Sequence, residues 1–183
     1  MTSVSDSWRR IEAWLAHNSP QVLAALRPPA AQEQIAHLES ATGLKLSQDV
    51  RQSFLIHDGS SDFGLISGNE LLSLQHAAGE WEFWVDFVES GQADGWATEP
   101  DAGVREGWFR RGWLPLTYDG AGDHACLDLD PGEGGQPGQI IEFWHDADDR
   151  KIVAPSFGAW LCQFADELER GAYNVNSNGW LEP

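Results

Sequence analysis

The chain has 183 residues, about the size of one domain, and 42% of them are hydrophobic, which is enough for a sizeable core. Its 11 Lys and Arg residues against 29 Asp and Glu residues give a formal net charge of −18 with His neutral. Because this field repels phosphate backbones and anionic headgroups, we expect no nucleic-acid partner and no membrane partner, and basic proteins are the favoured partners.

The first third of the chain predicts helices. Apolar residues recur at helical spacing in four segments, and a capping residue, glycine or proline stands near their ends. The expected helices are one capped by Ser5 or Ser7 and broken at 18–20, a short one at 21–26, one at 31–42 that Gly43 ends, and one that Ser47 caps. The amino terminus lacks a signal-type apolar segment, and no apolar run approaches the roughly 18 residues of a membrane span, which predicts a cytoplasmic protein.

Two short strands, a helix and a long loop are expected in the middle of the chain. The strands are 63–66 and 71–74, joined by a Gly-Asn turn, and the helix is 80–88. Residues 89–107 are rich in Gly and Asp and have little periodicity. We therefore expect a mobile or variable loop there, in which a partner would be selected.

A central sheet is expected from strands at 113–117, 124–130 and 139–144. In the second of these, apolar and polar residues alternate, which is typical of a strand with one buried face. The apolar face has Ala125, Leu127 and Leu129, and the polar face has His124, Cys126, Asp128 and Asp130. The connection 131–138 is too short for a crossover helix, so the last two strands should be antiparallel. Ser156 is placed to cap a closing helix.

The chain shows no internal repeat or domain linker, so a single domain is expected. We divide it into a helical extension at 1–30, a core at 31–171 and a partly ordered polar tail at 172–183. Ten Trp residues are unusual for this length. They are expected to pack in the core and at its rim, and an aromatic binding face for a sugar or peptide is the alternative.

Three neighbouring His and Asp pairs invite a metal interpretation, namely His57 with Asp58, Asp123 with His124, and His145 with Asp146. Imidazole and carboxylate ligands suit zinc or iron when they converge. Neither His57 nor His145 belongs to a helical i, i+4 ligand pair, and each carboxylate also suits a turn that needs local backbone hydrogen bonds. The sequence therefore predicts no metal site.

Nucleophilic catalysis is also weakly supported. Cys126 and His124 share a face of one strand, but no group that would orient a catalytic base can be identified. Cys126 and Cys162 have no metal-ligand spacing and predict neither a disulfide scaffold nor a zinc site. We predict no catalytic residue and no cofactor.

Five short segments in this order resemble the SUKH superfamily, which is named for yeast cell-wall assembly and glucan-synthesis regulators and has many bacterial relatives. They are Gly43-Leu44-Lys45-Leu46 with Glu39 before and Asp49 after it, His57-Asp58-Gly59, Trp113-Leu114-Pro115-Leu116, the run Gly122 to Asp128, and Ser156-Phe157 with Trp160-Leu161. Ser47 stands where the family usually has Pro. The resemblance implies an α+β fold with a central, largely antiparallel sheet flanked by helices.

The resemblance also implies a non-enzymatic role. Bacterial members are thought to neutralise toxins as immunity proteins, and fungal members are scaffolds in cell-wall signalling. The net charge favours a cytoplasmic bacterial immunity protein that binds a basic toxin, possibly a nuclease, although the acidity could serve solubility alone. A regulatory or scaffold protein of cell-wall or envelope synthesis is the alternative, and a metal-dependent hydrolase is third. Exposure and charge suggest a binding surface at Asp94, Trp96, Glu99, Asp101, Asp119, Asp123, Asp148 and Asp149.

Overall fold

A computed structural model describes residues 3–183. Its helices are α1 (Val4–Asn18), α2 (Pro20–Ala25), α3 (Gln32–Thr42), α4 (Gln48–Phe54), α5 (Leu74–Glu89) and α6 (Phe157–Glu169). Its strands are β1 (Glu70–Leu71), β2 (Glu99–Pro100), β3 (Trp113–Pro115), β4 (Thr117–Tyr118), β5 (His124–Asp128), β6 (Gln139–Phe143), β7 (Asp149–Arg150), β8 (Ile152–Ala154), β9 (Asn174–Val175) and β10 (Leu181–Glu182). No helix in this part of the chain is both long enough and apolar enough to cross a membrane.

The central sheet has four antiparallel strands in the order β3-β5-β6-β8. The β5–β6 register pairs His124 with Phe143 and Asp128 with Gln139, as the short connection between these strands predicts. The expected α+β fold with a largely antiparallel sheet flanked by helices is thus confirmed.

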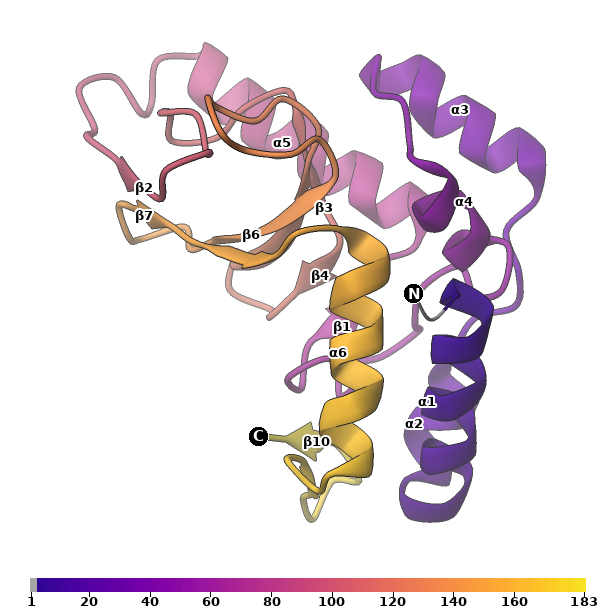
Figure 1. The fold of residues 1–183 in the computed structure, drawn as a ribbon. Coiled ribbons are helices and arrows are strands. Elements are labelled where there is room, and N and C mark those ends of the chain that lie inside the picture. Colours follow the sequence, from indigo (N-terminus) through magenta and orange to yellow (C-terminus); the bar gives the residue numbers. More distant parts are fainter. Residues whose placement is uncertain (1–2) are drawn as a thin grey trace.

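Helices cover the sheet on both sides (Figure 1). On one face Trp84 of α5 packs against the Phe143 ring with centroids 4.8 Å apart, and its indole N–H donates to His124. The other face is covered by α6, which also packs against α1. Arg10 of α1 pairs with Asp166 and Glu169 of α6 at 2.5 and 2.6 Å, and these ion pairs join the amino-terminal helix to α6.

The expectation that β5 has one solvent-facing side is wrong. His124, Cys126 and Asp128 are at most 3% exposed, because α5 covers the face that they occupy. Asp128 is tolerated there because its carboxylate accepts hydrogen bonds from the Gln139 amide and the Asp130 backbone N–H. Burial still raises the pKa of Asp128.

Two helix starts also differ from expectation. Ser3, rather than Ser5 or Ser7, caps α1 by accepting a hydrogen bond from a backbone N–H in its first turn. Residues 71–74 do not form a strand beyond Leu71, since Ser73 caps α5 and starts that helix six residues before the expected position. Residues 63–66 form no strand, and Ile66 makes only an isolated bridge to Asn69 across the turn at 67–68.

The two segments expected to be loosely held are both attached to the fold. Within 89–107, β2 pairs with β7 in parallel. The carboxy-terminal segment forms a hairpin, in which β9 pairs with β10 and Leu181 is fully buried. Trp180 packs on Phe63 with ring centroids 6.1 Å apart, so the tail covers the turn that precedes β1.

Candidate functional site

The β2–β7 pairing brings four of the expected site residues together. It aligns Glu99 with Asp149, and the backbone N–H groups of Glu99 and Asp101 donate to the carbonyls of Asp148 and Arg150 at 2.8 and 2.9 Å. Glu99, Asp101, Asp148 and Asp149 therefore lie along one short edge of the molecule, beside the central sheet (Figure 1). We call this group the acidic edge.

The four carboxylates of the acidic edge have different roles. Asp101 accepts a hydrogen bond from the backbone N–H of Ile152 at 2.9 Å, which holds the loop to the start of β8. Asp149 pairs with Lys151 at 2.6 Å, and this contact lowers the pKa of Asp149. Within residues 3–183 the carboxylates of Glu99 and Asp148 have no hydrogen-bond or ion-pair partner, and both residues are exposed. These two are free to contact another molecule.

A buried arginine, Arg150, connects the acidic edge to the protein core. Arg150 of β7 is fully buried, and its guanidinium donates to the backbone carbonyls of Trp108, Ala147 and Asp149 at 2.5 to 2.9 Å. The guanidinium also lies over the Trp108 ring at 5.1 Å and the Phe143 ring at 4.7 Å. Burial lowers its pKa, which the nearby acidic side chains partly offset. Arg150 thus joins the edge rigidly to the core of the sheet.

A series of contacting aromatic rings runs from Trp108, on which Arg150 stacks, to the exposed Phe83. Trp96 packs edge-on against Trp108 with centroids 4.4 Å apart, Phe87 packs against Trp96 at 5.9 Å, and Phe83 packs against Phe87 at 6.4 Å. Phe83 is 57% exposed and Trp96 is 49% exposed. We call Phe83, Phe87 and Trp96 the aromatic strip. Asp94 is exposed in the same loop.

The surface predicted from the sequence includes Trp96 but not Phe83, Phe87 or Arg150, which the structure places beside it. A signal for Phe83 and Phe87 was present, because residues 80–88 contain more large apolar side chains than one helix face can bury. No signal marked Arg150, since arginine is almost never fully buried without a charged partner.

Asp119 and Asp123, the remaining expected site residues, belong to the turn between β4 and β5. One oxygen of Asp119 accepts the backbone N–H groups of residues 121, 122 and 123 at 2.8 to 2.9 Å. Burial would raise the pKa of Asp119, but these three donors outweigh it and the pKa is lowered. The Asp119 carboxylate therefore stabilises the turn between β4 and β5.

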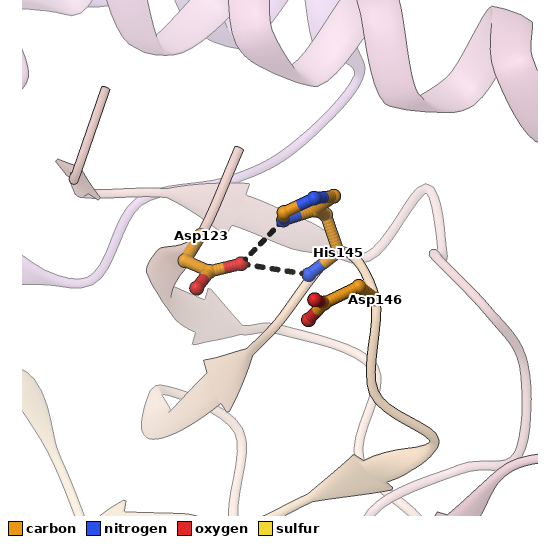
Figure 2. Close-up of side chains that lie close together, drawn as sticks. All are labelled: Asp123, His145 and Asp146. Carbon is orange, nitrogen blue, oxygen red and sulfur yellow. Dashed lines mark hydrogen bonds and ion pairs between the residues drawn. The ribbon is translucent and has the colours of Figure 1, made fainter. Parts of the chain in front are cut away.

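Asp123 forms a small cluster with His145 and Asp146 (Figure 2). One Asp123 oxygen accepts both the backbone N–H and the ring Nδ1–H of His145, each at 2.8 Å. This hydrogen bond raises the pKa of His145. Ligand atoms of the three residues lie within 4.8 Å of one another, the only such group among the described residues. We assign no metal to it, because one Asp123 oxygen already accepts two hydrogen bonds from His145 and the ring Nδ1 of His145 is engaged in one of them.

The other two expected histidines lie in separate settings. His57 bonds to Glu12 at 2.7 Å and to a backbone carbonyl at 2.9 Å, against α1. His124 donates from Nδ1 to the Thr117 carbonyl at 2.7 Å and accepts the Trp84 indole N–H at Nε2, and burial lowers its pKa. Within residues 3–183 neither His57 nor His124 joins the group of Asp123, His145 and Asp146.

The cysteine on β5 is unsuited to nucleophilic attack. Cys126 is fully buried, and burial raises the pKa of its thiol far above the ordinary value. The thiol is thus protonated at neutral pH and out of reach of a substrate.

The chain is similar to several fungal proteins that are named as regulators of the cell wall or of glucan synthesis. The chain is 31% identical to the cell wall biosynthesis/cell cycle regulator smi1 of Schizosaccharomyces pombe, in an alignment with 96% of this chain and 38% of that protein. It is 28% identical to the cell wall assembly regulator SMI1 of Saccharomyces cerevisiae, over 94% of this chain and 42% of that protein. It is also 28% identical to a glucan synthesis regulatory protein of Neurospora crassa, over 96% of this chain and 40% of that protein.

The chain therefore spans less than half the length of these three regulators. The sequence model of the SMI1/KNR4 family, SUKH-1, matches residues 29–163, which include the central sheet and the acidic edge. Because this match covers well over half of the chain, the protein is a member of the SMI1/KNR4 family.

Proposed function

We propose that this chain is a non-enzymatic protein-binding module that regulates cell-wall synthesis, and that the acidic edge and the aromatic strip contact a basic partner protein. The matched relatives carry names of cell-wall and glucan-synthesis regulators, which supports the regulatory part of the proposal. The observation that carries the binding part is the continuous surface from Phe83 through Trp96 to Glu99 and Asp148, with Arg150 fixing its centre.

This surface has the two components that a protein interface needs. Exposed aromatic rings supply most of the binding energy at interfaces, because they bury a large area at low cost in side-chain entropy. Carboxylates around them steer a basic partner into place and exclude acidic ones. Since the rings are already packed on one another, little ordering is required on binding.

Neutralisation of a basic toxin is the second candidate, and the net charge of −18 favours it. It ranks lower because the matched relatives are named as regulators of the cell wall. The two candidates differ in the partner rather than in the surface used.

Affinity capture from the native cell, followed by mass spectrometry, tests the proposal. The test variant is Glu99→Gln with Asp148→Asn, and the control is Glu33→Gln with Glu82→Gln, which removes two exposed carboxylates elsewhere on α3 and α5. We expect a basic partner that the control retains, the test variant loses, and about 0.5 M salt releases.

The partner's identity separates the two candidates. A component of cell-wall synthesis or its signalling supports regulation, and a secreted toxin encoded nearby supports immunity. Equal capture by both variants, or a partner whose retention ignores salt, would overturn the assignment of this surface.

A further inference from the structure

A hollow of about 360 Å³ lies between the central sheet and α6, on the face opposite α5. The cross-strand pair Ala125 and Glu142 lines it from the sheet, and Trp144, Trp160 and Tyr173 line it with aromatic rings. Its volume is in the usual range of ligand pockets, roughly 300 to 1,000 Å³. We call it the α6 pocket.

The register of β5 and β6 creates this hollow. Ala125 lies directly opposite Glu142, so the two Cβ atoms are roughly 5 Å apart on the face that α6 covers. Phe164 and Val153 also line the pocket, but the methyl group of Ala125 leaves space that a larger side chain would fill. The pocket is therefore lined by aromatic, aliphatic and polar side chains, and the carboxylate of Glu142 is on its sheet side.

The charges that line the pocket all have one sign. Its lining includes Asp123, Glu142 and Glu167 and has no Lys or Arg. Asp123 is bonded to His145, as described above, and Glu167 accepts hydrogen bonds from Gln163 at 3.0 Å and from Arg170 at 3.2 Å.

Glu142 is the unpaired member of the set. No group within residues 3–183 donates a hydrogen bond to its carboxylate or forms an ion pair with it. The charge of Lys151 acts on it, but Lys151 is held by Asp149 at 2.6 Å. Partial burial without a partner raises the pKa of Glu142, so a cation that entered the pocket would relieve an unfavourable state.

We propose that the α6 pocket binds one cationic group, a guanidinium or alkylammonium, with Glu142 as its ion-pair partner and the ring of Trp160 as its main aromatic contact, since the Lys151 ammonium already lies over the Trp144 ring at 5.4 Å. A guanidinium suits the site best, because its planar face stacks on aromatic rings while its edge pairs with a carboxylate. The same chemistry is offered by an arginine side chain of a partner and by a free small amine. The proposal does not depend on the acidic edge.

Titration with small ligands, followed by NMR of the indole N–H signals, tests this inference. The probes are N-acetyl-arginine amide, its neutral isostere N-acetyl-citrulline amide, and butylguanidine as a small molecule with a single positive charge. We expect the two cations to shift the signals of Trp144 and Trp160, and citrulline to leave them unchanged. Tighter binding of the peptide-like probe points to a partner side chain, and tighter binding of butylguanidine points to a small metabolite.

Three variants complete the test. Glu142→Gln should weaken binding about tenfold or more, because a charged hydrogen-bond acceptor is lost. Ala125→Leu should fill the pocket and abolish binding, and Glu33→Gln, remote on α3, should have no effect. Equal shifts from citrulline and arginine in the native protein, or unchanged affinity of Glu142→Gln, would overturn the proposal, and the citrulline comparison needs no variant to fold.

Discussion

Replacing Arg150 with Met should destabilise this protein more than almost any other single change of a charged residue. Methionine keeps the length of the apolar stem but removes the guanidinium. Three backbone carbonyls, those of Trp108, Ala147 and Asp149, would then lose their donor. Unlike a side-chain carboxylate, a carbonyl of the main chain cannot be replaced by an apolar group, so the penalty of leaving it unpaired remains.

The magnitude follows from these contacts. Each carbonyl left without a donor costs about 1–3 kcal/mol when it stays dry, and the stacking on two aromatic rings adds about 0.5–2 kcal/mol. The removed guanidinium no longer has to be desolvated, which offsets part of this sum. We therefore expect the free energy of unfolding to fall by about 3–5 kcal/mol, a value typical of disrupted buried charge networks.

Urea unfolding followed by circular dichroism measures this loss directly. Arg9→Met is the matched control, because Arg9 is a surface residue with a 72% exposed side chain whose pairing with Asp6 should contribute less than about 1 kcal/mol. Arg150→Lys should lie between the two, since an ammonium can donate to the carbonyls but cannot stack as a plane. A loss below about 1 kcal/mol for Arg150→Met, with the denaturant slope unchanged, would refute the reasoning.

Three further predictions concern stability. The pKa of His124 is lowered in the folded state, so the stability that its neutral form contributes is present above its unfolded pKa of about 6.5 and is lost as pH falls below that value. The difference in unfolding free energy between the native protein and His124→Gln should therefore shrink in acid, and a difference that does not change with pH would contradict this. The pKa of His145 is raised by its hydrogen bond to Asp123, so the stability that this pair contributes is complete below about pH 6.5 and is lost as pH rises through the raised pKa. Asp123→Asn should therefore lower the melting temperature more at acidic than at alkaline pH, and the reverse order would exclude the charged pair. Gly59 has φ +73°, and a Cβ atom added there would overlap the Leu71 carbonyl oxygen. Gly59→Ala should therefore lower the free energy of unfolding in urea by more than about 2 kcal/mol, and an unchanged value would show that this turn can rearrange.

Elements with a local chemical marker could be predicted from the sequence. Gly43 ends α3 in a left-handed conformation, Ser156 caps α6, and the short connection before β6 required antiparallel pairing. In each case residues within one turn of the chain decide the outcome.

Features that depend on distant segments could not be predicted in the same way. The alternation in β5 reads as one buried face, but α5 covers the polar face as well, and His124 finds its partner 40 residues away in Trp84. The strands β2 and β7 have two residues each, too few for any periodic pattern.

The candidate site was predicted in part for the same reason. Charge and loop composition drew attention to the carboxylates that form the acidic edge, but they could not separate the free Glu99 and Asp148 from Asp101 and Asp149, which hold the fold together. That distinction depends on which backbone N–H group or Lys side chain lies opposite each carboxylate, and only the tertiary structure places those partners.

The parallel pairing of β2 with β7 also has a consequence for the order of folding. Asp101 and Ile152, which this pairing brings into contact, are 51 residues apart in the sequence. Because closing a loop of this length costs more chain entropy than forming a local contact, we expect the edge to close after the local elements, and its closure gathers four like charges. Their mutual repulsion would oppose that step, and the basic partner proposed above would act as a counterion to it.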